Sequence, residues 1–217
     1  MKLYRKQAVG IGILFLTAMA SYMVGSELTS SSVNSANQFT NINMNFLQIG
    51  IILEFINSAA VLGIAVLFHR ILKTYSETTS ILYVLSRSLE AFLLLICSVC
   101  TLTIALTNPQ NVQVVAPYLL SMRELLFQTA MIALGAGSIF MCQTLFASRL
   151  IPRPLSILGI VGYAALLLSG LLSLFGYHQF GMMLFIPGAL FEIAFPLWLF
   201  WKGFTPKAPD GRLTDSV

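Results

Sequence analysis

Charged side chains are scarce in this sequence, since aspartate, glutamate, lysine and arginine together make up 9% of its 217 residues. Hydrophobic residues make up 57%, and the mean hydropathy is +0.85. Soluble domains of this length carry far more charge and fewer apolar residues. The composition therefore excludes a soluble protein and indicates a protein that crosses the membrane several times.

Residues that commonly bind metals or carry catalysis are also few. The two histidines, His69 and His178, are predicted at opposite surfaces of the membrane, so they cannot share a metal site within one chain. Both aspartates, Asp210 and Asp215, lie in the C-terminal tail, which excludes an intramembrane aspartyl pair.

The sequence motifs of conventional enzymes are missing as well. The chain has no HExxH, GxSxG, GxGxxG or P-loop sequence. Cys97 and Cys100 form a CxxC pair, but the βαβ context of a redox motif is absent, and packing of small buried side chains is the favoured interpretation. We therefore expect no metal, no cofactor and no conventional enzyme. The catalytic chemistry that remains open is a glutamate acting as base or proton carrier.

What the sequence does contain is a series of long apolar segments. Each has about 20 residues or more, enough to cross a hydrocarbon core of about 30 Å as a helix. The six segments are 7–26, 46–68, 80–107, 118–147, 155–175 and 181–201. We predict an all-α bundle of six transmembrane helices within residues 1–204, followed by a short polar tail at 205–217. The Ser-, Asn- and Thr-rich stretch at 27–45 is expected to be a connector, or a lid over a pocket.

The first segment has a second interpretation. Its basic start and the sequence Ala18-Met19-Ala20 resemble a cleaved signal peptide. The apolar stretch continues past this point toward Gly25, which favours a retained span.

Lysine and arginine predict the orientation of the spans. They precede the first span and follow the second, fourth and sixth, whereas none of the three opposite loops contains either residue. By the positive-inside rule both termini, and with them the tail, are cytoplasmic. The excess of lysine and arginine is therefore explained by orientation in the lipid bilayer, the expected partner, and gives no reason to expect binding of nucleic acid. Only Arg87 and Arg123 break the pattern, and both lie inside spans.

The third span carries a polar stripe on an otherwise apolar helix. Arg87 and Glu90 are three residues apart and Tyr83 precedes Arg87 by one turn, so all three share a face. A charged side chain near the bilayer centre costs about 2.5–3.5 kcal/mol on insertion scales. The stripe is therefore expected to face compensating groups inside the bundle.

Further polar residues lie in the second and fourth spans. Glu54 and Asn57 share one helix face, which predicts either a polar helix interface or the wall of a pocket. Arg123 and Glu124 are adjacent and diverge by about 100° around the helix, so they cannot point the same way. Gln128 lies on the face of Glu124.

The sixth span contains Glu192 between Pro187 and Pro196. Pro196 cannot bond the carbonyl of Glu192, four residues earlier, so a carboxylate and a freed carbonyl occur at one level. This pattern fits either a kink that shapes the bundle or a ligand or cation site.

We expect the charged groups inside the spans to converge on the bundle interior, because exposure to lipid is costly. Four carboxylates would then face two guanidinium groups, so a bound proton, a cation or a cationic ligand would complete the site. The predicted ligand-binding residues are Glu54, Asn57, Tyr83, Arg87, Glu90, Arg123, Glu124, Gln128 and Glu192.

Three stretches in order along the chain resemble a known family. They are Leu85-Ser-Arg-Ser-Leu-Glu-Ala91, the Ile-Pro-Arg-Pro-Leu-Ser loop within 147–159, and Phe191-Glu-Ile-Ala-Phe-Pro-Leu-Trp at the start of 191–204. They are similar to the bacterial multi-pass membrane family catalogued as domain of unknown function 4386. The resemblance implies a six-helix protein of the bacterial plasma (inner) membrane and supplies no reaction or substrate.

The first functional hypothesis is a protein that binds or transports a small molecule, a lipid or a proton-coupled solute, with Glu90, Glu192 and Arg87 at its centre. The alternative is a structural or accessory membrane protein whose buried ion pairs only fix helix packing. An intramembrane enzyme that uses a glutamate base is the weakest of the three hypotheses.

Overall fold

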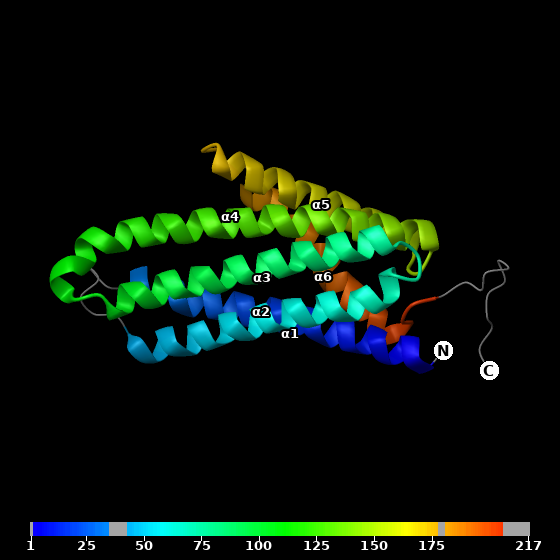
Figure 1. Ribbon diagram of the computed structural model, residues 1–217, viewed down its shortest axis with the longest axis horizontal. Coiled ribbons are helices and arrows are strands. Elements are labelled where there is room, and N and C mark those ends of the chain that lie inside the picture. Colours follow the sequence, from blue (N-terminus) through cyan, green and yellow to red (C-terminus); the bar gives the residue numbers. More distant parts are fainter. Residues whose placement is uncertain (1, 35–42, 178–180, 206–217) are drawn as a thin grey trace.

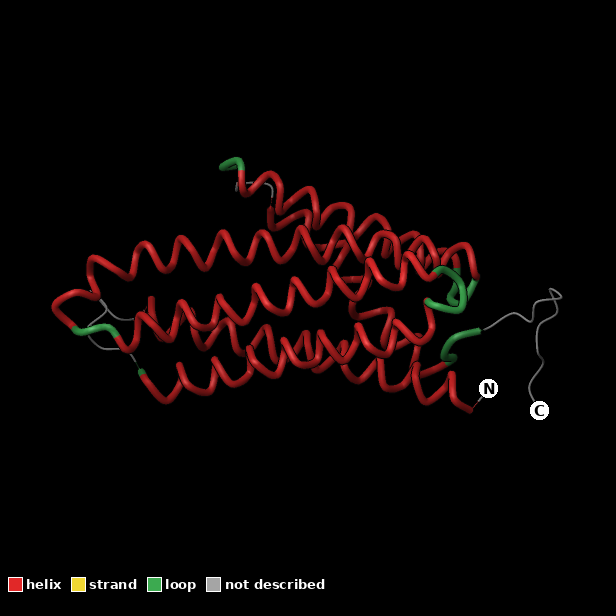
Figure 2. The backbone as a smooth tube through the Cα atoms, in the orientation of Figure 1, coloured by secondary structure: helices red, strands yellow, loops and turns green. Residues whose placement is uncertain are grey.

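The computed structural model describes residues 2–34, 43–177 and 181–205. These form six helices, α1 Lys2–Asn34, α2 Met44–Leu72, α3 Glu77–Leu106, α4 Pro109–Ser148, α5 Arg153–Leu174 and α6 Gly181–Trp201 (Figure 1). Within the described residues there is no strand (Figure 2). Each of the six helices is long and apolar enough to cross a membrane, which confirms the predicted all-α bundle of six spans. Most of the predicted tail, from residue 206 on, and His178 lie outside the described residues.

Consecutive helices run antiparallel and pack side by side, and α6 packs back against α1. The helices therefore form a closed ring in which every helix has two neighbours. Short connections allow this order, because the links from α2 to α3 and from α4 to α5 are only four residues long, 73–76 and 149–152. Each of the six helices can therefore contribute side chains to the bundle interior.

The two ends of the bundle differ in charge. The end at which α1 begins and α6 ends carries exposed Arg5, Lys6, Arg70, Lys73, Arg149, Arg153 and Lys202, and we call it the basic end. The opposite end, the distal end, carries no lysine or arginine on the surface of the part that is described. This distribution agrees with the sequence pattern, and the cytoplasmic orientation of the basic end stays a prediction.

The helices differ in length as well. At 1.5 Å per residue α4, with 40 residues, is about 60 Å long, whereas α6, with 21 residues, is about 32 Å long. Since α5 and α6 both reach the basic end, α3 and α4 extend well past them at the distal end (Figure 1). One length of α6 suffices to cross a hydrocarbon core of about 30 Å. The longer helices therefore exceed the length that one crossing requires.

Two predicted loops are partly helical. Residues 27–34 belong to α1, where the hydroxyls of Thr29 and Ser32 donate to the carbonyls of Ser26 and Leu28, at 3.0 and 2.6 Å. This bonding satisfies the hydroxyls within the helix. The predicted lid lies partly at 35–42, outside the described residues, and remains untested.

Likewise, α4 begins nine residues before the predicted 118 and contains Pro117. Proline removes one backbone hydrogen bond without ending the helix, and α4 bends sharply near its start (Figure 1).

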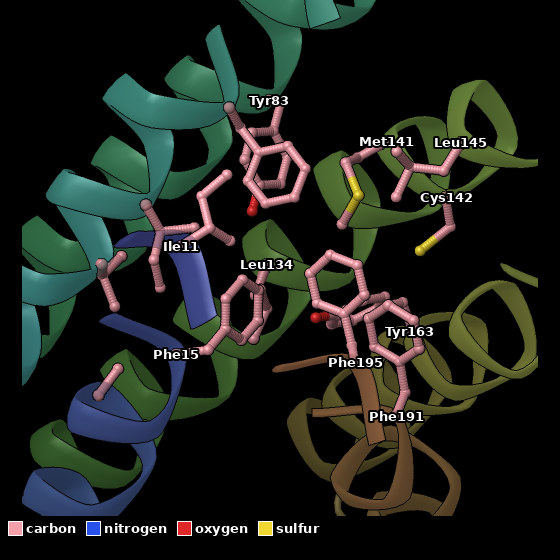
Figure 3. Close-up of a cluster of buried hydrophobic side chains, with 14 of the residues drawn as sticks. Ile11, Phe15, Tyr83, Leu134, Met141, Cys142, Leu145, Tyr163, Phe191 and Phe195 are labelled. Atoms are coloured by element: carbon pink, nitrogen blue, oxygen red, sulfur yellow. The ribbon is translucent and has the colours of Figure 1, made fainter. Parts of the chain in front are cut away.

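An aromatic core fills the middle of the bundle. Phe191 and Phe195 of α6 stack at 5.1 Å between ring centres, and Phe195 meets Phe15 of α1 edge-on at 5.5 Å. Tyr83 of α3 and Tyr163 of α5 belong to the same cluster, with Tyr163 beside Phe191 (Figure 3). Such pairs favour these offset and edge geometries. The polar residues described next lie next to this aromatic core.

Candidate functional site

A polar cavity of about 330 Å³ lies in the distal half of the bundle, between α1, α2, α3 and α4. Its lining mixes charged, hydroxyl, amide and aromatic side chains. Among the lining residues are Tyr22, Ser26, Thr29, Glu54, Asn57, Cys97, Thr101, Arg123, Glu124 and Phe127. Four of the nine predicted ligand-binding residues, Glu54, Asn57, Arg123 and Glu124, therefore come together here.

An ion pair between Glu54 of α2 and Arg123 of α4 forms one wall of the cavity. Arg123 Nη2 donates to Glu54 Oε1 at 2.5 Å, and Nη1 donates to Oε2 at 3.4 Å. Nη1 also donates to Thr101 Oγ1 at 2.6 Å and to the Cys97 carbonyl at 3.0 Å. This forked geometry suits a guanidinium better than an ammonium, because it presents several donors in one plane.

The carboxylate of Glu54 has two further donors. Ser98 Oγ of α3 donates to Oε2 at 2.5 Å, and Thr29 Oγ1 of α1 donates to Oε1 at 3.0 Å. The pair thus ties together four helices, and both charges are compensated by an opposite charge and by neutral donors or acceptors. Removing one member of such a buried pair typically costs about 3–5 kcal/mol.

Asn57 lies one turn beyond Glu54 on the same face of α2 and lines the cavity. Only 4% of the residue is exposed, no hydrogen bond joins its side-chain amide to another described residue, and the amide is not among the fully buried polar atoms. Buried amides are normally paired, and an asparagine side chain offers two donors and one acceptor. Asn57 is therefore the group on this wall that is open to a bound molecule.

Glu124 and Gln128 behave as their shared helix face predicts. Gln128 Nε2 donates to Glu124 Oε1 at 2.6 Å. Glu124 is exposed as well as lining the cavity, so its carboxylate lies at the cavity mouth, whereas Arg123 points inward. The prediction that the adjacent pair diverges is confirmed.

A second polar cluster lies closer to the basic end. Tyr83, Arg87 and Glu90 of α3 are all buried, and Arg87 Nη1 is 2.9 Å from Glu90 Oε2. The contact is an ion pair, and Tyr83 Oη, Arg87 Nε and Glu90 Oε2 have no hydrogen-bond partner in the part of the chain that is described. The guanidinium carbon lies 6.0 Å from the ring centres of both Phe15 and Tyr83. Ring faces stabilise a cation in such a place.

Glu192 of α6 belongs to this second cluster. Tyr163 Oη of α5 donates to Glu192 Oε1 at 3.3 Å. α6 remains a continuous helix through Pro187 and Pro196, as a sequence with two internal prolines allows when neighbouring helices support it.

The six intramembrane charges do not converge on one centre, which corrects the sequence-based expectation. Ser98, which holds Glu54, follows Glu90 by eight residues on α3, a rise of about 12 Å. Arg87 lies about 15 Å along α3 from its start, whereas Glu54 lies about 27 Å from the basic end of α2. Counting residues from the basic ends of the spans could have shown this separation.

Several polar partners were not among the predicted residues. Thr29 fell in a segment expected to be a loop, and Tyr163 lies in a span that carries no charge. Ser98 and Thr101 had a usable signal, because they follow Glu90 by eight and eleven residues and so continue its helix face. Among the described residues, no group of three or more His, Cys, Asp or Glu side chains is arranged to hold a metal ion.

Comparison with known proteins gives one match. The family described as Domain of unknown function (DUF4386) matches residues 11–203, which include all six helices in part or in full. No curated protein and no solved structure matches the chain. The match extends over most of the sequence and over both polar clusters, and the chain therefore belongs to the DUF4386 family of domains of unknown function.

Proposed function

We propose that the distal cavity binds a small organic cation, and that the protein is a binding or transport protein of the membrane. The observation that carries this proposal is a cavity of about 330 Å³ whose wall presents the amide of Asn57, which makes no hydrogen bond to a described residue. Ligand sites commonly have volumes of about 300–1,000 Å³ and a few convergent polar groups. The cavity is at the lower end of this range, which favours a small ligand.

The position of the cavity supports access from water. Glu54 and Arg123 lie about 27 and 38 Å from the basic ends of their helices, counted at 1.5 Å per residue. A hydrocarbon core of about 30 Å that begins at the basic end would end at this level. The cavity mouth, where Glu124 lies, would then face the aqueous phase or the headgroups at the distal surface.

The charges around the cavity favour a cation. Glu54 and Arg123 neutralise each other, whereas Glu124 is paired only with the neutral amide of Gln128. Tyr22 and Phe127 stack at 5.8 Å between ring centres and line the same cavity, so aromatic rings are available to an ammonium group. An amine with a short apolar body matches both features.

The test is retention of small amines by the protein in nanodiscs, measured by native mass spectrometry. Asn57→Ala and Glu124→Gln should each lower retention about tenfold, as expected for loss of one hydrogen bond to a charged ligand. Asn111→Ala is the matched control, because Asn111 is exposed on α4 and does not line the cavity. Retention that is unchanged in Asn57→Ala and Glu124→Gln, or no retention by the wild type, would contradict the proposal.

A structural role is the second candidate, and the hydrogen-bonded Glu54–Arg123 network favours it. The network joins four helices and could fix their register without any ligand. The experiment separates the two roles. A purely structural network predicts that no ligand is retained and that substitution of Glu54 or Arg123 only lowers stability. The third hypothesis, a glutamate-base enzyme, gains no specific support; the described histidine, His69, contacts Ser80 at the basic end and lies away from the distal cavity.

The family resemblance supports a location in the bacterial plasma membrane, and the positive-inside rule supports a cytoplasmic basic end.

A further inference from the structure

A second cavity, of about 300 Å³, lies at the basic end between the α4–α5 loop and the end of α6. It is lined by Arg149, Ile151, Pro152, Arg153, Trp198 and Thr205. We propose that it binds the phosphate group of an anionic phospholipid. The site is at the opposite end of the bundle from the distal cavity, so this proposal is independent of the proposed function.

The cavity is rich in positive charge that nothing in the described chain neutralises. Arg149 and Arg153 line it, and neither forms an ion pair with any described carboxylate. Lys202 lies beside it, with Nζ 5.1 Å from the ring centre of Trp198. The Arg153 guanidinium lies over the ring of Phe146 at 5.3 Å, which orients it without using its donors. Arginine N–H groups that have no carboxylate partner match the oxygens of a phosphate in geometry and charge.

Trp198 and the N-terminus of α5 border the same cavity. The indole Nε1 of Trp198 is buried and has no acceptor among the described residues. α5 begins at Arg153 with Pro152 as its N-cap and no side chain that caps it; Pro152 and Pro154 have no N–H and Ser156 N donates to the Pro152 carbonyl, so the N–H groups of Arg153 and Leu155 are the ones left open. The positive end of a helix dipole and open N–H groups together favour an anion.

The backbone builds this cavity. Arg149 adopts a left-handed conformation, φ +55°, which ends α4. After α6, Gly203 with φ +69° turns the chain back, so that Thr205 N donates to the Leu150 carbonyl at 3.0 Å. The Thr205 hydroxyl donates to the same carbonyl at 3.1 Å. Two segments far apart in sequence are therefore fastened together around the cavity.

The surroundings favour a lipid over free phosphate. Trp198 and Trp201 lie at the end of a membrane-spanning helix, the position at which tryptophans mark the headgroup level. Exposed Ile157 of α5 and Leu197 of α6 continue from the cavity region toward the membrane interior. Acyl chains could lie on these side chains while the phosphate occupies the cavity. Basic pockets between transmembrane helices at this level are typical headgroup sites.

The test compares lipid retention in nanodiscs made of phosphatidylcholine with and without phosphatidylglycerol, again by native mass spectrometry. The wild type should retain phosphatidylglycerol preferentially, and Arg153→Gln with Lys202→Gln should lower this retention at least about tenfold, since two cations at the cavity are removed and each cation close to an anionic headgroup contributes about fivefold to affinity. The matched control is Arg70→Gln with Lys73→Gln, which removes the same charge at the same end but outside the cavity. Its retention should stay within about twofold of wild type.

A second measurement follows Trp198 directly. In Trp201→Phe, Trp198 is the single tryptophan, and its emission should shift when phosphatidylglycerol is added but not when inorganic phosphate is added. Equal loss of retention in the two double variants would assign the effect to general surface charge and overturn the proposal. Unchanged Trp198 emission with the lipid would also overturn it, and an equal shift with inorganic phosphate would overturn the choice of a lipid.

Discussion

Replacing Arg123 by methionine removes the guanidinium from the distal network and leaves most of the volume of its apolar stem. Arg123 makes close contacts to Glu54 through both terminal nitrogens and also bonds Thr101 and the Cys97 carbonyl. After the change, Glu54 keeps only neutral donors, from Thr29 and Ser98. A carboxylate that is buried in this way must either stay charged without a cation or take up a proton.

The size of the effect follows from burial. The side chain of Glu54 is 5% exposed and that of Arg123 is 17% exposed. Breaking a buried pair costs about 3–5 kcal/mol, and partial exposure of Arg123 to the cavity places the expected loss near 3 kcal/mol. For a chain of this length that corresponds to a melting temperature lower by about 6–12 °C.

The assay is thermal unfolding in nanodiscs, followed by circular dichroism, for Arg123→Met, Glu54→Leu and the double variant. The double variant should lose less stability than the sum of the single variants, with a coupling of about 1–3 kcal/mol. Arg70→Met is the control, because Arg70 is exposed at the basic end and forms no ion pair with a described residue. If Arg123→Met melts as the wild type does and no coupling is found, the network does not hold the four helices together.

Three further predictions concern the second cluster, the α5–α6 contact and the orientation. Arg87→Leu combined with Glu90→Leu should be tolerated better than either change alone, because a lone buried charge is left in each single variant; equal or greater loss in the double variant, measured by the same unfolding assay, would contradict this. Gly162→Val should lower the free energy of unfolding by more than about 3 kcal/mol, since a Cβ at Gly162 would lie 2.8 Å from the backbone of Gly188. A melting temperature like that of the wild type would contradict the close packing of α5 on α6. In cells, Tyr177→Cys in a background without other cysteines should react with a membrane-impermeant maleimide, because Tyr177 is exposed at the distal end; labelling only after permeabilisation would reverse the predicted orientation.

The sequence by itself determined the properties that depend on neighbours along the chain. Hydropathy over about 20 residues was enough to place six spans, and the 3.6-residue period was enough to put Arg87 beside Glu90 and Gln128 beside Glu124. The limits of α1 and α4 were missed because 27–34 and 109–117 are polar or contain proline, so their helical state depends on hydrogen bonding and packing that hydropathy does not measure.

Only the tertiary structure decided which polar residues meet. Glu54 and Arg123 are 69 positions apart, and Tyr163 and Glu192 lie on different helices, so no local spacing pairs them. Their pairing follows from the ring order of the helices and from the height of each residue along its axis. Glu54 and Arg123 meet in the distal half of the bundle, between α1, α2, α3 and α4, whereas Arg87, Glu90 and Glu192 lie closer to the basic end. Side chains interact over a few ångströms, and a rise of about 12 Å between the two levels therefore makes two polar sites out of residues that the sequence alone suggested were one.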